Sequence, residues 1–191
     1  MNYKYILSVV LLAVVYTNNV FAGEYFGFKL GLQNISQITT QLKKSGASFE
    51  PDYGYKGYSN DLRVFKIISL DKFSKYGSLK DAWLSFSPDK KLYKITVTWS
   101  DPGKTFKLLH DALVSKYKRP EESGTGFVRT YKFKDGDVDF KLVRNTFGFG
   151  SRQTTNLEYI FKPALSKVKE MKARIEEDIK NKNAKKASTD L

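Results

Sequence analysis

The chain contains no cysteine among its 191 residues. This absence excludes disulfide bonds, thiolate metal sites, a cysteine nucleophile and a tether through a lipid-modified cysteine. The fold must therefore rely on its hydrophobic core, and a domain of about 150 residues buries roughly 70% of its unfolded-chain surface. Residues 23–165 are long enough to form such a core, so we predict a single domain there.

Histidine is almost as scarce, because His110 is the only one. A histidine-based metal site or a Ser-His-Asp triad would have to form around it, and no metal-ligand spacing accompanies it. Aspartates alternate over 135–139 as in acidic calcium loops, but Phe140 and Thr146 stand where an EF-hand loop needs glycine and glutamate. We therefore expect no metal and no cofactor, and we favour a protein that is not an enzyme.

Long apolar runs are also missing, with one exception at the start of the chain. Lys4 is followed by the apolar run Ile6–Val15 and then by Val20-Phe21-Ala22. A positive start, a short apolar run and small side chains at the cleavage offsets are typical of a signal peptide, and the run is shorter than the roughly 20 residues of a membrane span. We predict that residues 1–22 are cleaved and that the product is periplasmic or secreted. Because exported eukaryotic domains usually carry disulfides, the lack of cysteine favours a bacterium.

Acidic residues are fewer than basic residues. The chain has 33 lysines and arginines against 20 acids, a net charge of +13, which becomes +12 when the leader with its one lysine is removed. The excess is spread along the sequence, so it predicts general attraction to an acidic protein, an anionic envelope polymer or a membrane surface at its periphery. Nucleic acid fits the charge too, but predicted export and the lack of a recognisable nucleic-acid motif disfavour it.

Helix-capping residues predict two helices in the body of the chain. Asn34 with Gln37 three residues later forms a capping box at the start of the first. Asp101-Pro102 places a cap and a first-turn proline at the start of the second. A third helix is predicted over 166–180 from apolar residues at helical spacing. Residues 181–191 have nothing to bury and are predicted to be a disordered basic tail.

Between the helices the apolar residues recur with a period of two, which predicts strands and hairpins. The segments with this pattern are 25–30, 64–70, 82–86, 93–99, 127–133, 138–142 and 157–161. The predicted class is α+β, with antiparallel sheet whose one face is covered by helices. The order of elements suggests two copies of a helix-then-three-strands unit, followed by the C-terminal amphipathic helix.

Three tyrosines mark the first candidate binding segment. Tyr53, Tyr55 and Tyr58 are separated by Gly54, Lys56 and Gly57. Glycine-rich loops with several tyrosines are common at recognition surfaces, because tyrosine offers rigid contact area with a polar tip. The alternative is that these rings fold back over a sheet edge or a helix.

The second candidate lies in a glycine-rich loop that contains Phe147, Phe149 and Arg152. It lacks the Gly-Lys-Ser/Thr ending of a phosphate-binding loop. Arg129 is a further candidate binding residue. Strict alternation places it on the same face as Tyr131, where an unpaired charge would be costly. Either a bulge turns this arginine outward or it is paired inside.

The segment Phe26–Leu32 resembles the opening of small bacterial envelope modules such as the outer-membrane assembly lipoproteins and the β-lactamase-inhibitor-like group. The resemblance covers this one short segment, and the chain lacks the cysteines of those proteins. It implies a protein-binding role.

Together these observations favour an exported, non-enzymatic binding or accessory module of the bacterial envelope. One alternative is a secreted effector or inhibitor that binds another protein. A second is an enzyme that acts on envelope glycans through two carboxylates, chosen from Glu121, Glu122, Asp135, Asp137 and Asp139.

Overall fold

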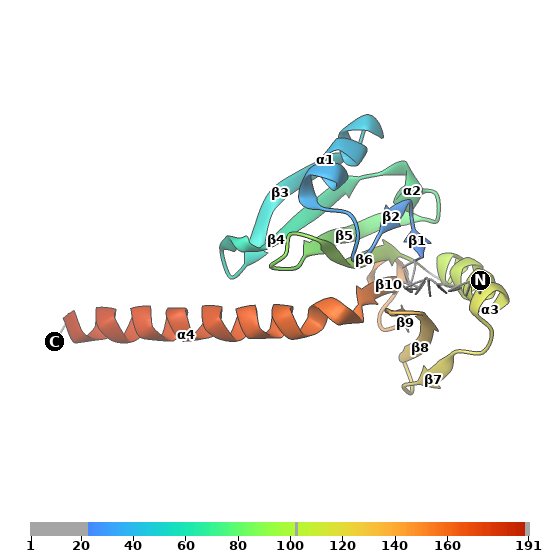
Figure 1. Ribbon diagram of the computed structural model, residues 1–191. Helices are drawn as coiled ribbons and strands as arrows, with labels where there is room; N and C mark the ends of the chain where they lie inside the picture. Colours follow the sequence, from blue (N-terminus) through green and yellow to red (C-terminus); the bar gives the residue numbers. More distant parts are fainter. Residues whose placement is uncertain (1–22, 102, 190–191) are drawn as a thin grey trace, which may run out of the picture.

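The structure is a computed structural model that describes residues 23–189 except Pro102 (Figure 1). The predicted signal peptide, residues 1–22, lies outside the described residues. Among the helices that are described, none combines the length and apolar character needed to cross a membrane.

An eight-stranded antiparallel sheet organises the described part, with strand order β3-β4-β5-β6-β10-β9-β8-β7. Its strands are β3 (Ser48–Tyr55), β4 (Tyr58–Ser69), β5 (Ser78–Phe86), β6 (Leu92–Ser100), β7 (Glu121–Ser123), β8 (Val128–Asp135), β9 (Val138–Asn145) and β10 (Thr154–Phe161). The predicted α+β class and antiparallel pairing are confirmed. The predicted strand 25–30 is instead a short hairpin of β1 (Glu24–Tyr25) and β2 (Phe28–Lys29), because Phe26 and Gly27 turn the chain with positive φ.

The sheet has two halves with the same order of elements. Helix α1 (Ile35–Lys44) precedes β3–β6, and helix α3 (Lys104–Tyr117) precedes β7–β10. The halves join where β6 pairs with β10 at the centre of the sheet. Each half thus has four strands after its helix, one more than predicted. The two strands missed, β3 and β7, are the edges of the sheet, and edge strands need no apolar alternation.

One face of the sheet, the inner face, carries the main core. A row of side chains runs across six strands on this face, each at most 5% exposed: Phe65, Leu84, Ile95, Tyr159, Phe140 and Phe133. Ile38 and Leu42 of α1 and Phe106 and Leu109 of α3 belong to the same buried cluster. A short helix, α2 (Asp71–Ser74), adds the fully buried Phe73.

The two main helices begin differently. Asn34 caps α1 with the predicted capping box, since its side chain accepts from Gln37 N while Gln37 Oε1 accepts from Asn34 N, both at 2.9 Å. Helix α3 begins at Lys104, later than predicted. The Asp101 carboxylate still caps it, accepting from the backbone N–H groups of Thr105 and Phe106 at 2.9 and 2.7 Å.

Helix α4 (Leu165–Thr189) lies on the opposite face of the sheet, the outer face. Figure 1 shows α1 and α4 on opposite sides of β4 and β5, with α4 running past the sheet toward the C-terminus. Val168 and Ile175 pack against Leu62 and Tyr93 in a second, smaller core. This core covers part of the first half; the second half keeps its outer face open.

The helical part of α4 is longer than predicted. Residues 181–189 are helical with exposed side chains, where the sequence analysis predicts a disordered tail. Adding residues to an existing helix avoids the cost of nucleation, and Ala184, Lys185, Lys186 and Ala187 are good helix formers. Burial is therefore not needed to continue the helix beyond Ile179.

Candidate functional site

The three predicted tyrosines lie on one hairpin and not in a loop. Tyr53 and Tyr55 belong to β3, and Tyr58 opens β4 directly opposite Tyr55. Lys56 and Gly57 form the turn with φ of 48° and 86°, which fits a two-residue hairpin with positive φ at both central positions. Gly57 thus belongs to the turn, whereas Pro51 and Gly54 lie at bulges in an edge strand.

Tyr53 and Tyr55 line a groove of about 290 Å³ between the outer face and α4, which we call the outer groove. Its lining residues are Tyr53, Gly54, Tyr55, Leu62, Val64, Trp83, Ser85, Phe86, Tyr93, Lys94 and Lys172. Five of these are aromatic, two are lysines, and the described lining contains no acid. A concave surface of this kind suits an apolar or aromatic side chain next to a negative charge.

Trp83 and Tyr53 form the exposed aromatic side of the outer groove. Their ring centroids are 5.3 Å apart in an edge-to-face arrangement, and Tyr53 is 41% exposed. Lys66 Nζ lies 5.6 Å from the Tyr53 centroid and 5.9 Å from that of Trp83. The indole N–H of Trp83 donates to Asp81. These rings offer an ordered apolar surface with a cation beside it.

Helix α4 forms the other side of the outer groove. Lys172 Nζ lies 5.0 Å from the Tyr55 ring centroid. The Tyr55 hydroxyl and the Lys56 ammonium both donate to Glu176. Hydrogen bonds from Lys56 and then from Tyr55 lower the pKa of Glu176. Glu176 is therefore engaged with the hairpin, while Lys172 remains on the groove lining.

Tyr58 has a different role from its two neighbours. Its ring packs against the second core beneath α4, and its hydroxyl accepts from Lys182 Nζ at 3.1 Å. Tyr58 is not one of the described residues that line the outer groove. The alternative that the ring folds against a helix describes Tyr58, and it also describes Tyr55, which packs against the same core and donates to Glu176 of α4.

Glu158 connects the outer groove to the open half of the outer face. It is 7% exposed and lies between Lys94, at 2.7 Å, and Lys141, at 2.9 Å. Burial alone would raise the pKa of Glu158, but the hydrogen bonds from Lys94 and Lys141 outweigh it and lower the pKa. The carboxylate is thus held ionised and does not serve as a proton donor near neutral pH.

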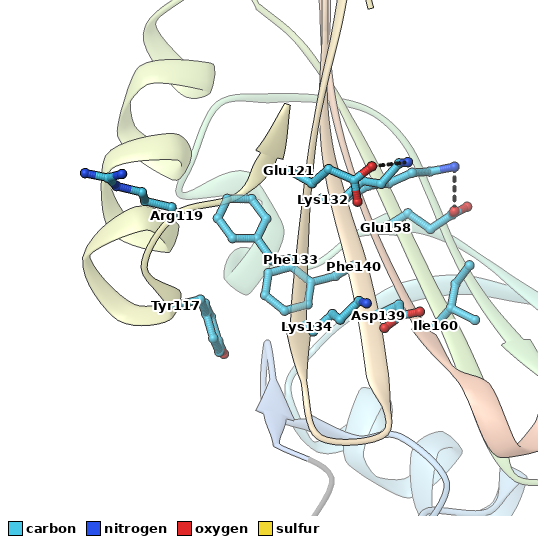
Figure 2. A pocket seen from close by; sticks show the side chains of 11 residues that line it. Tyr117, Arg119, Glu121, Lys132, Phe133, Lys134, Asp139, Phe140, Glu158 and Ile160 are labelled. Carbon is cyan, nitrogen blue, oxygen red and sulfur yellow. Dashed lines mark hydrogen bonds and ion pairs between the residues drawn. The ribbon is translucent and has the colours of Figure 1, made fainter. Parts of the chain in front are cut away.

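A second cavity, the edge pocket, has a volume of about 440 Å³ and lies at the outer edge of β8. Figure 2 shows Tyr117 and Arg119 on one side and charged outer-face side chains on the other, with Phe133 and Phe140 between. The pocket forms because β7 begins only at Glu121. Pro120 lacks an N–H group and Lys118 has a φ of 64°, so the strand does not extend along this edge.

The five carboxylates of the enzyme hypothesis are divided among different places. Glu121 and Asp139 line the edge pocket, where each forms an ion pair with a lysine, Lys132 and Lys162 respectively. Outside that lining, Glu122 pairs with Arg129, Asp135 accepts from Tyr25, and Asp137 supplies only a backbone contact to Lys162. The surroundings of Asp101, Asp111, Glu158 and Glu176 lower the pKa of each of these carboxylates, which is opposite to the shift that acid catalysis needs.

The second predicted segment lies at the other end of the strands. Phe147 and Phe149 are 67% and 92% exposed, and Phe147 meets the 62% exposed Phe127 with ring centroids 5.8 Å apart. Arg152 is exposed on the same loop. We call Phe127, Phe147 and Phe149 the phenylalanine tip. It is separate from the outer groove, because the β3–β4 turn lies beyond the opposite strand ends.

Arg129 keeps its register, opposite Arg144, without a bulge. It is nevertheless exposed, with 59% of its side chain accessible, and it pairs with Glu122 at 3.6 Å. Its position near the strand end lies beyond the residues that α3 covers. The alternation predicts its face, but whether a helix covers that face depends on tertiary packing.

His110 packs on aromatic neighbours, with its ring 5.4 Å from Phe106 and 4.8 Å from Tyr131 between centroids. Among the residues that the structure describes, no group of three histidine, aspartate or glutamate side chains is arranged to hold a metal ion. No family model, no curated protein and no solved structure matches this chain.

The residues that complete the outer groove were not singled out from the sequence. Trp83, Lys94 and Lys172 line the groove and Lys66 lies beside it, and these four residues come from three strands and a helix. A signal for Trp83 existed, because the alternation that directs Ala82 and Leu84 inward directs this tryptophan outward. The lysines had no such signal, since outward lysines are ordinary on any sheet.

Proposed function

We propose that this chain is a non-enzymatic binding module of the bacterial envelope that holds an acidic segment of a partner protein in the outer groove. The predicted signal peptide and the net charge of +12 that remains after its removal agree with an exported protein that attracts acidic partners. The observation on which the proposal depends is the lining of the groove, which combines five aromatic residues with Lys172 and with Lys94, itself paired with Glu158, and includes no acid among its described residues.

The size and chemistry of the groove define the segment it fits. About 290 Å³ accommodates one or two side chains and not a folded domain. Trp83 and Tyr53 would contact an apolar or aromatic side chain of the partner, and Lys172 and Lys66 would pair with a neighbouring carboxylate. Aromatic residues such as tyrosine and tryptophan are enriched at protein-recognition surfaces.

The open half of the outer face offers room for the rest of the partner. Around Val143, this surface carries half-buried hydroxyl and amide side chains, which continue onto β6 of the first half: Thr130, Asn145, Thr154 and Asn156, with Thr96 and Thr98 of β6. They share the outer face with Trp83 through the register of β5, β6 and β10. Such groups hydrogen-bond a polar partner without the desolvation cost of a charge.

The enzyme alternative receives less support from the geometry. It needs one carboxylate with a raised pKa beside a second carboxylate in a cleft. In the edge pocket the buried carboxylate is Glu158, and its pKa is lowered by two lysines. Binding therefore fits the described side chains better than glycan hydrolysis does.

Site-specific photo-crosslinking tests the proposal. A photo-reactive residue in place of Ser85, which lines the outer groove, should crosslink to a protein of discrete mass in an envelope extract. The matched control carries the same residue in place of Ser36, exposed on α1. The Ser85 product should disappear in the double variant Tyr53→Ala, Lys172→Glu.

Two results would contradict the proposal. One is equal crosslinking from Ser36 and Ser85 to the same species, which indicates non-specific contact. The other is a Ser85 product that persists in the double variant while circular dichroism shows both proteins folded.

A further inference from the structure

The phenylalanine tip is the most exposed apolar feature of the described chain, and the outer groove does not account for it. Its three rings are 62%, 67% and 92% exposed. Single exposed apolar side chains are normal, but three phenylalanines on two adjacent loops at one end of the molecule form a patch that needs a cause. Val128, next to Phe127, adds a fourth exposed apolar side chain at 43%.

The loops that carry these rings are held in place by hydrogen bonds. Thr146 N donates to Phe127 O at 2.8 Å and joins the two loops. Phe147 N donates to Asn145 Oδ1 at 2.9 Å, and the Gln153 amide donates to Gly148 O at 3.0 Å. The exposure of the rings is therefore a consequence of a specific loop geometry.

Gly148 is required by this geometry. Its φ is 84°, and a Cβ at this position would lie 3.0 Å from Arg152 Cβ. A residue with a side chain would strain the backbone and displace Arg152. The glycine therefore allows Phe147 and Phe149 to follow a tight turn with Arg152 at its base.

The charged side chains of the two segments that form the tip are arginines, and one of them, Arg129, pairs with Glu122 of β7 at 3.6 Å. The segments 124–129 and 144–153 contain three arginines and no acid. Arg152 is exposed, and Arg129 has 59% of its side chain accessible. Arg144 instead lies over the Phe106 ring, 5.1 Å from its centroid, and supports the tip from within.

We propose that the phenylalanine tip inserts into the surface of a bilayer that contains anionic phospholipid, with Arg129 and Arg152 bound to the phosphate groups. Phenylalanine rings that project from a loop enter the boundary between head groups and acyl chains, and arginine pairs with phosphate through two parallel hydrogen bonds. The tip lies at the strand ends opposite the β3–β4 turn, so the outer groove stays accessible when the tip is inserted.

A lipid surface fits the tip better than a protein pocket does. The rings project from the molecule, and a bilayer receives projecting rings without a matching shape. The absence of acids from both segments also matches the negative surface potential of anionic lipids, to which each nearby arginine or lysine adds attraction.

Vesicle co-sedimentation of residues 23–191 tests this proposal. These residues contain every described element and omit the apolar run Ile6–Val15, which would bind lipid by itself. The protein should bind vesicles of phosphatidylcholine with about 30% phosphatidylglycerol, and pure phosphatidylcholine should bind at least tenfold more weakly. The double variant Phe147→Ser, Phe149→Ser should lose at least tenfold in partitioning to the anionic vesicles.

Two controls separate tip insertion from general charge attraction. Tyr53→Ser removes an exposed ring at the other end of the molecule and should leave vesicle binding unchanged. Lys185→Glu with Lys186→Glu changes charge by more than the tip variant does, on the exposed end of α4. It should weaken binding less than the loss of the two phenylalanines.

The proposal is overturned if the double phenylalanine variant binds anionic vesicles as tightly as the unchanged protein. It is also overturned if the lysine variant alone abolishes binding, because α4 would then be the lipid contact. If the vesicles bind neither protein while a crosslinker placed at Phe149 captures one envelope protein, the tip is a protein contact and the lipid assignment is wrong.

Discussion

The two halves of the sheet have the same order of elements but differ on their outer faces. In both halves a helix covers the inner face and buries apolar side chains, such as Leu84 in the first half and Leu142 in the second. On the outer face, α4 packs against Leu62 and Tyr93 of the first half. The second half instead presents the ion pairs of Glu158 and four half-buried polar side chains, Thr130, Asn145, Thr154 and Asn156.

This difference determines where a partner can bind. An inner face covered by a helix is committed to the core, whereas an outer face is available unless another element lies on it. The outer groove forms at the border of this covered region, where α4 packs on Leu62 and Tyr93 and leaves Trp83 and Ser85 of β5 on the groove lining. A site at such a border combines apolar lining residues with polar, solvent-exposed surroundings.

The substitutions with the largest expected effect test whether the inner faces of the two halves contribute equally to stability. Leu84→Ala and Leu142→Ala each remove a side chain with no exposed surface, one from each half. Each should lower the free energy of unfolding by about 3.5 kcal/mol, because a buried leucine leaves a cavity in a packed core. Urea unfolding followed by circular dichroism measures both. Two separate transitions in either variant would show that the halves fold independently.

Removal of the α4 contact should have the next largest effect, confined to the first half. Ile175 is 1% exposed and packs on the outer face of that half. Ile175→Ala should cost about 2.5 kcal/mol. Amide exchange should accelerate at Leu62 and Tyr93 and stay unchanged in β8 and β9. Equal acceleration in both halves would contradict the comparison.

The two helix caps should respond differently to acid. Burial alone would raise the pKa of Asp101, but the hydrogen bonds from Thr155, Phe106, Thr105 and Gly103 outweigh it and lower the pKa. A depressed folded-state pKa stabilises the fold above the unfolded value of about 4, and this stabilisation is lost as pH falls through the folded pKa.

Asp101→Asn should therefore cost about 2 kcal/mol near neutral pH and progressively less below about pH 4. The matched control is Asn34→Ala at the start of α1, which should cost about 1 kcal/mol at every pH because its cap is neutral. Denaturant titrations across this pH range measure both. A loss that does not depend on pH for Asp101→Asn would refute the assignment.

The outer-face ion pairs should contribute less than any core residue. Glu158→Gln removes the charge that Lys94 and Lys141 share. Because both lysines are partly exposed, the expected loss is about 1 kcal/mol. The loss should shrink in high salt, which thermal unfolding at two salt concentrations would show. A loss above about 3 kcal/mol would mean that the open face is more deeply buried than the structure indicates.

Deletion of residues 181–191 should have the smallest effect. The described residues of this segment are exposed, so the free energy of unfolding should change by less than about 0.5 kcal/mol. Calorimetry measures the change. A larger loss would show that the end of α4 packs on something beyond the Lys182 contact to Tyr58.

The sequence pattern predicted the elements of this fold that depend on interactions between residues close in the sequence. The capping box at Asn34, the hairpin over β5 and β6 and the amphipathic start of α4 follow from spacing alone. Strand β3 was missed, because Pro51 and Gly54 are typical of loops and within a sheet are found mainly at edges and bulges. Which face α4 covers depends on contacts more than a hundred residues apart, such as Tyr55 with Glu176.

The candidate site was predictable only in part for the same reason. Tyr53 and Tyr55 were singled out by composition, but the rings and lysines that make them a groove come from β4, β5, β6 and α4. Phe147, Phe149 and Arg152 were recognised as one loop, whereas the pairing with Phe127 required the register of β8 with β9.

The central claim is that the outer groove is the binding surface, and titration calorimetry with the protein crosslinked through Ser85 tests it most directly. Tyr53→Ala should weaken the affinity for that protein at least tenfold, about 1.4 kcal/mol. Phe149→Ser, at the far end of the strands, should leave the affinity unchanged. If Phe149→Ser abolishes binding and Tyr53→Ala has no effect, the outer groove is not the site.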